Sequence, residues 1–206
     1  MKGFGEQYIS KKKVQKKNKS SKEQRINQAL NLHNQGKFSE ALELYKKFVD
    51  EKINDHRVFI NYGAIVHKLG RLTEGEYFYR KAIEIKPDYT IAHYNLALIL
   101  QEVGKLKEAE LFFRKAIETK HDYYAEAHNN LAVILRKFGK LEEAELFFRK
   151  AIEIKSDYAS AYCNLGNLLR DFGKFEEARS CSEKTMSLRP WSILGSHSFN
   201  YEMKLD

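Results

Sequence analysis

Five asparagines recur through the sequence at an almost constant interval. They are Asn27, Asn61, Asn95, Asn130 and Asn164, and successive members lie 34, 34, 35 and 34 residues apart. A side-chain amide both donates and accepts hydrogen bonds, so it can pair with the N–H and C=O groups of a peptide whatever side chains that peptide carries. Amides at a regular interval therefore predict a ladder of sites for another polypeptide, if the fold places them on one surface.

The other residue types that could carry chemistry show no such order. Cys163 and Cys181 form no paired-cysteine motif, and His33 and His67 have no carboxylate or cysteine near them at metal-ligand spacing. No glycine-rich phosphate loop is present. The sequence therefore predicts no enzymatic activity, no metal and no cofactor.

Cysteine usage and hydropathy bear on location. Two cysteines cannot build a disulfide framework, which favours a reducing compartment and a cytoplasmic protein. The longest uninterrupted apolar runs have five residues, too few to span a bilayer. We therefore expect no membrane span.

The interval between the asparagines reflects repetition of whole segments. Residues 104–118 and 139–153 differ at a single position. Each repeat has two amphipathic stretches of about a dozen residues, with apolar residues at three- and four-residue steps, and this spacing predicts helices. A glycine stands between the two stretches, where a left-handed turn can end the first helix. A small residue follows each glycine five positions later. The glycines are Gly36, Gly70, Gly104, Gly139 and Gly173, and the small residues are Ala41, Gly75, Ala109, Ala144 and Ala178.

This unit resembles the tetratricopeptide repeat. The resemblance rests on its length, the glycine, the small residue and the aromatic that follows it, which is Tyr45, Tyr79, Phe113 or Phe148. It implies an all-α, right-handed superhelical solenoid of stacked antiparallel helix pairs, similar to bacterial tetratricopeptide proteins and to the superhelix of O-linked N-acetylglucosamine transferase. We expect five repeats over residues 22–190, at about 22–55, 56–89, 90–124, 125–158 and 159–190.

The resemblance also implies where a ligand binds. First helices of such pairs line a concave groove, and asparagines at the equivalent position contact peptide backbone in well-known members of the family. The alternative is that asparagine is common at this position of the family's repeats for reasons other than peptide binding. Further groove residues predicted from their positions are His67, Lys68, Tyr94, Gln101, Arg136 and Arg170.

Those side chains and their neighbours suggest what the partner is like. Arginines can hold carboxylates through two hydrogen bonds, which favours an acidic partner towards the C-terminal half, although a solvated face of mixed charge is the alternative. The residues of a carboxylate clamp are absent. The apolar inner row instead favours a partner with hydrophobic side chains, either an extended peptide or an amphipathic helix.

The two ends of the sequence break the repeat. Residues 1–21 are rich in lysine and serine, and we expect a disordered basic tail. Its lysines could contact nucleic acid or another anion weakly, or serve only for solubility; they include Lys11, Lys12, Lys13, Lys16 and Lys17. Residues 191–206 are expected to form a C-terminal cap or a truncated extension.

Together these features predict a non-enzymatic scaffold that binds a peptide or helix of another protein in its groove. Two alternatives stay open. One is the substrate-presenting part of a glycosyltransferase-like or other transferase protein whose catalytic domain is not in this sequence. The other is an adaptor that the basic N-terminal tail tethers to nucleic acid or membrane.

Overall fold

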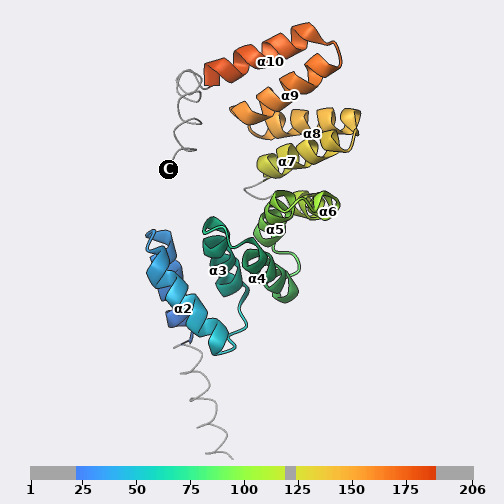
Figure 1. The fold of residues 1–206 in the computed structure, drawn as a ribbon. Helices are drawn as coiled ribbons and strands as arrows, with labels where there is room; N and C mark the ends of the chain where they lie inside the picture. Colours follow the sequence, from blue (N-terminus) through green and yellow to red (C-terminus); the bar gives the residue numbers. More distant parts are fainter. Residues whose placement is uncertain (1–21, 119–123, 189–206) are drawn as a thin grey trace, which may run out of the picture. The chain divides into compact units, whose positions relative to one another are not determined.

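The computed structural model describes residues 22–118 and 124–188, and all regular structure within these ranges is helical (Figure 1). Residues 1–21, 119–123 and 189–206 lie outside the described part. The predicted basic tail, with Lys11, Lys12, Lys13, Lys16 and Lys17, and the predicted cap or extension at 191–206 therefore stay predictions.

The chain divides into two compact units, Met1–Ala92 and His93–Asp206. In the first unit a helix over residues 22–34 is followed by α2 (Phe38–Asp50), α3 (His56–Lys68) and α4 (Leu72–Ile85). Helix α3 contacts both α2 and α4. Two hydrogen bonds of 2.8 and 2.7 Å join the Arg25 guanidinium to the Glu51 carboxylate, and they hold the helix over 22–34 against the end of α2.

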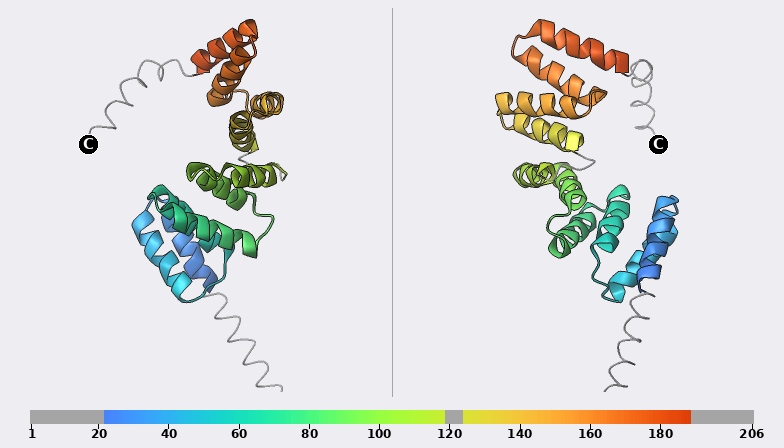
Figure 2. Two further views of the ribbon diagram at one scale, coloured as in Figure 1. Left: turned by 45° about the vertical axis from the view of Figure 1, so that its right-hand side comes forward. Right: turned by 180° about the vertical axis from the view of Figure 1, so that it is seen from behind.

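Three further helix pairs follow, and all of their residues except 90–92 lie in the second unit. They are α5 (Thr90–Glu102) with α6 (Leu106–Ile117), α7 (Tyr124–Lys137) with α8 (Leu141–Ile154), and α9 (Ala159–Asp171) with α10 (Phe175–Leu188). From α6 to α10 each helix packs against the next one along the chain, and Figure 2 shows the same succession from two sides. The predicted all-α solenoid of stacked helix pairs is confirmed. We call the helix over 22–34 and α3, α5, α7 and α9 the first helices, and their partners the second helices.

The turn inside each pair has the predicted left-handed glycine. Its φ lies between 73° and 78° in all five repeats, at Gly36, Gly70, Gly104, Gly139 and Gly173. The N–H of the following residue bonds to a carbonyl five residues back, as from Lys140 to Leu135 at 3.0 Å. This bond closes the end of the helix as in a Schellman motif.

Aromatic side chains fill the space between the helices of each pair. The aromatic residues that share one position of the repeat are at most 1% exposed, and they are Tyr45, Tyr79, Phe113 and Phe148. The small residue four positions earlier lets the two helices approach, and all five of these residues are buried. Gly63 has the same role on α3, since a β-carbon there would lie 2.7 Å from the Tyr79 ring.

Ion pairs connect successive second helices of the second unit. The Arg114 guanidinium bonds to Glu110 on its own helix and to Glu143 on α8, both at 2.7 Å. One repeat later, Arg149 bonds in the same way to Glu145 and to Glu177 on α10, again at 2.7 Å. These pairs are partly exposed, so each contributes only between a few tenths of a kcal/mol and about 1 kcal/mol to stability.

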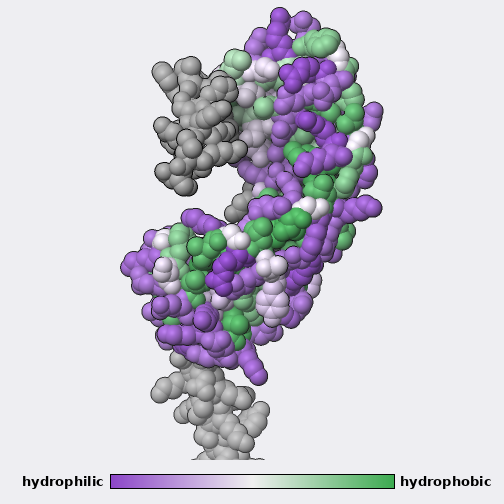
Figure 3. All heavy atoms as spheres, viewed as in Figure 1, coloured by the Kyte–Doolittle hydropathy of each residue, from purple (hydrophilic) through white to green (hydrophobic). Residues whose placement is uncertain are grey.

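On the face drawn in Figure 3, hydrophilic residues predominate and hydrophobic ones form scattered patches.

Candidate functional site

A hydrogen-bonded network crosses the first helices of the second unit, and we call it the inner amide network. The Asn164 side chain on α9 donates to the Asn129 side-chain oxygen on α7 at 2.9 Å. Asn129 donates to the Asn130 side-chain oxygen at 3.4 Å, and Asn130 donates to the Tyr94 hydroxyl on α5 at 3.3 Å. Two ladder asparagines and one predicted groove tyrosine are thus joined across three repeats.

The network fixes how its amides are oriented. The donors follow one another from Asn164 through Asn129 to Asn130, and Tyr94 is the last acceptor. In both bonds that join two helices, the donor belongs to the helix that comes later in the sequence. Each bond uses one N–H of its donor amide, so a second N–H remains on each, and every amide oxygen has two acceptor sites. Asn130 and Asn164 are half-exposed, so these groups can reach a ligand. Tyr94 is 8% exposed and acts mainly as the anchor of the network.

Asn129 is the residue that the sequence reasoning missed. It stands one position before the ladder residue Asn130 and is 5% exposed. Because its oxygen accepts from Asn164 and its N–H group donates to Asn130, it links two repeats of the ladder. The only signal in the sequence was a second asparagine beside the recurring one. Asn95, the ladder residue of α5, is half-exposed.

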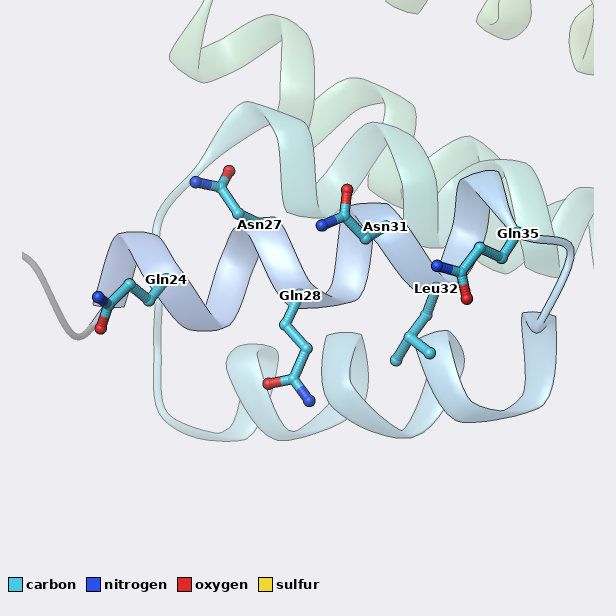
Figure 4. Close-up of a pocket in the computed structure, with 6 residues that line it drawn as sticks. All are labelled: Gln24, Asn27, Gln28, Asn31, Leu32 and Gln35. Atoms are coloured by element: carbon cyan, nitrogen blue, oxygen red, sulfur yellow. The ribbon is translucent and has the colours of Figure 1, made fainter.

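The two ladder residues of the first unit differ from those of the second. Asn61 donates its side-chain N–H to the Arg57 carbonyl of its own helix at 2.8 Å. Asn27 is exposed and lines an open hollow of about 390 Å³ on the helix over 22–34 (Figure 4). The other residues of the hollow lie on that same helix or in the turn that follows it, and they are Gln24, Gln28, Asn31, Leu32 and Gln35.

The predicted secondary residues take varied positions. His67 is half-buried with its ring edge-on to Tyr79, and the Lys68 ammonium lies 4.5 Å from the centre of the Phe38 ring. The side-chain oxygen of Gln101 is buried without a hydrogen-bond partner. On the C-terminal side, Arg136 and Arg170 are exposed, and Arg170 donates to the Asn167 side-chain oxygen at 3.0 Å.

The positive charge of one arginine near the ladder is already balanced by carboxylates of the protein itself. The Arg57 guanidinium donates two hydrogen bonds to Glu23, at 2.7 and 2.9 Å, and further bonds to Asp55. These bonds raise the pKa of Arg57, and they hold the pKa of both carboxylates below their ordinary values. Arg57 is therefore engaged within the protein, whereas Arg136 and Arg170 are exposed towards solvent.

The described residues contain neither a metal-binding cluster nor a membrane-spanning helix. Among them, no group of three or more histidine, cysteine, aspartate or glutamate side chains is arranged to hold a metal ion. No helix in the same residues is long and apolar enough to cross a membrane.

Comparison with known proteins identifies the repeat. Models of the tetratricopeptide repeat match residues 26–90, 78–110, 125–158 and 147–180, which together exceed half of the chain. No curated protein matches the sequence.

Solved structures share the fold at low sequence identity. MamA from Desulfovibrio magneticus is 18% identical with a TM-score of 0.71, over 82% of this chain and 94% of that one. YrrB, described as a TPR protein with an unusual peptide-binding site, is 22% identical with a TM-score of 0.70, over 85% and 90% of the two chains. PilF from Pseudomonas aeruginosa is 15% identical with a TM-score of 0.72, over 82% and 77%.

The left-handed glycine in every turn, the small and aromatic residues packed between paired helices, and the matching family models all agree. The chain belongs to the tetratricopeptide repeat family, whose arrays are protein-interaction scaffolds.

Proposed function

We propose that this protein is a non-enzymatic scaffold that binds an extended peptide or an amphipathic helix of a partner protein along its first helices. The observation that carries the proposal is the inner amide network of Tyr94, Asn130, Asn129 and Asn164. It holds recurring amides in fixed orientations on successive first helices, while two of them stay half-exposed.

The network favours binding because its amides are ordered before the partner arrives. A free asparagine side chain loses rotamer freedom when it grips a ligand, and that loss weakens binding. Asn130 and Asn164 are already held by neighbours, so less freedom remains to be lost. Each hydrogen bond to the partner backbone then contributes about 1 kcal/mol net.

Charge on the same helices bears on the partner's side chains. Arg136 and Arg170 are exposed near the C-terminal ends of α7 and α9. Their guanidinium groups can each accept a carboxylate through two parallel hydrogen bonds. We therefore propose a partner segment that places acidic residues beside these two arginines, with its backbone on the amides.

Affinity capture with mass spectrometry tests the proposal. The full chain is immobilised beside a variant that combines Asn95→Ala, Asn130→Ala and Asn164→Ala. A partner held by the amides is expected to be captured by the wild type and lost from the variant. The exposed residue Asn54, in the loop before α3, provides the matched control, because Asn54→Ala removes an amide that is outside the inner amide network.

The outcome is decided by the comparison between the variants. Circular dichroism first establishes that the triple variant keeps its helices. Equal capture by wild type and triple variant would remove the amides from the binding mechanism. Loss from the Asn54→Ala control as well would show that the loss is not specific to the amides of the first helices, and it would contradict the proposal.

A further inference from the structure

One face of the helix over 22–34, continued into the turn that follows it, consists of uncharged amides. Gln24, Gln28, Asn31 and Gln35 succeed one another at steps of four, three and four residues, so they lie on one side of the helix. All four side chains are exposed. We call these four residues the amide stripe.

The amide stripe borders the open hollow of about 390 Å³, and Asn27 and Leu32 complete its lining (Figure 4). Every residue that lines the hollow is therefore uncharged, although 31% of the residues of the protein are charged. A surface without charge does not attract an acidic or a basic partner over a distance. It offers hydrogen bonds instead, together with some apolar surface at the half-buried Leu32.

The charged side chains beside the amide stripe are engaged within the protein. Arg25 donates two hydrogen bonds to Glu51 at the end of α2, and Glu23 accepts two from Arg57 of α3. These ion pairs tie the flanks of the helix to the rest of the first unit. The stripe itself lies on the side of the helix opposite the fully buried Ile26, so it faces outward.

The order of the amides makes the stripe complementary to itself. Steps of four, three and four residues read the same in both directions along the helix. In an antiparallel pair of these helices about a twofold axis, Gln24 therefore lies opposite Gln35 of the other copy, and Gln28 lies opposite Asn31. An amide both donates and accepts hydrogen bonds, so each member of the stripe meets a group that matches it.

We propose that two copies of this protein associate through their amide stripes, with the helices over 22–34 antiparallel across a twofold axis. A charged segment of another protein would find no opposite charge on the stripe, whereas a second copy supplies an amide for every amide. One helix from each copy makes an interface of less than about 1,200 Å² in total, so we expect a weak dimer that forms at high concentration. The contact does not involve the inner amide network, which lies in the second unit.

Sedimentation velocity of the full chain over about a hundredfold range of concentration tests the proposal. The wild type is expected to shift from monomer towards dimer as the concentration rises. Combining Gln28→Lys with Asn31→Lys places like charges opposite each other twice across the axis, and it is expected to weaken the dimer at least about tenfold. Combining Gln28→Glu with Asn31→Lys places opposite charges there instead, and the dimer is expected to be at least as strong as in the wild type.

The matched control combines Asn34→Lys with Asn54→Lys, which adds the same charge at exposed positions outside the stripe. It is expected to leave the dimer unchanged, and circular dichroism establishes that each variant keeps its helices. A wild type that stays monomeric over the whole range would overturn the proposal. A dimer that the two stripe variants affect equally would also overturn it, because the copies would then meet elsewhere or in another register, and so would a dimer that the control weakens as much as the double lysine variant.

Discussion

Replacing Gly63 by alanine tests the close packing inside a repeat. The residue lies within α3, where alanine would ordinarily stabilise a helix by about 1 kcal/mol relative to glycine. Here the added β-carbon would lie 2.7 and 2.8 Å from two carbons of the Tyr79 ring, which is 1% exposed and has little room to move. Overpacking of this kind costs about 1–3 kcal/mol. We therefore expect Gly63→Ala to lower the free energy of unfolding by about 1 kcal/mol.

A double-mutant cycle followed by urea unfolding separates the clash from other effects. In a Tyr79→Leu background the clash is removed, so Gly63→Ala is expected to become neutral or stabilising. Gly139→Ala is the matched control, because its β-carbon meets nothing within 4 Å and its cost, about 1 kcal/mol, comes only from the φ of 73°. That cost is expected to be the same in both backgrounds. A stabilising Gly63→Ala in the wild-type background would refute the reasoning.

Three further predictions concern charge, pH and the amide network. Arg149→Met is expected to cost less than about 1 kcal/mol of unfolding free energy, and urea titrations should show the difference from wild type vanish at about 1 M salt, because its ion pairs are partly exposed. Burial lowers the pKa of His33, with the nearby Lys68 adding to the effect, so the unfolded chain binds its proton first and stability falls as pH drops below about 6.5. Thermal melts across this range should therefore show a weaker acid destabilisation for His33→Gln but an unchanged one for the exposed control Asn34→Gln. Asn129→Ala removes the acceptor of Asn164 and is expected to lower the urea midpoint by an amount equivalent to about 1 kcal/mol; an unchanged midpoint would show that the network adds nothing to stability.

The helix pairs and their turns could be predicted from sequence because each depends on local properties of the chain. Gly104 between two amphipathic stretches predicts a left-handed turn, and its φ is 78°. Ala109 and Phe113, one helical turn apart, predict the buried side of α6, and both are fully buried. The same pattern occurs in five copies, so each repeat predicts the same pair of helices and the same turn.

The bonding of the amides could not be predicted in this way. Whether Asn130 bonds to Tyr94 or to a ligand depends on side-chain rotamers and on the register of neighbouring repeats, and a one-dimensional pattern contains neither. Asn61 stands at the same repeat position as Asn130, yet it bonds to its own helix backbone. The difference lies in the neighbours: Asn130 and Asn164 bond to Tyr94 and Asn129 of the preceding repeat. The residue at the equivalent position before Asn61 is Ile26, whose side chain has no polar atom.

Site-specific crosslinking from α9 tests the central claim most directly. Cys163 is exposed beside Asn164, and Cys181→Ser leaves it as the only thiol of the protein, to which a benzophenone maleimide can be attached. The control carries the same label on the outer surface of α6, in a protein with Leu111→Cys, Cys163→Ser and Cys181→Ser. If first helices bind the partner, the label at Cys163 crosslinks to a partner polypeptide and the label at position 111 does not. Crosslinking from position 111 alone would contradict the account.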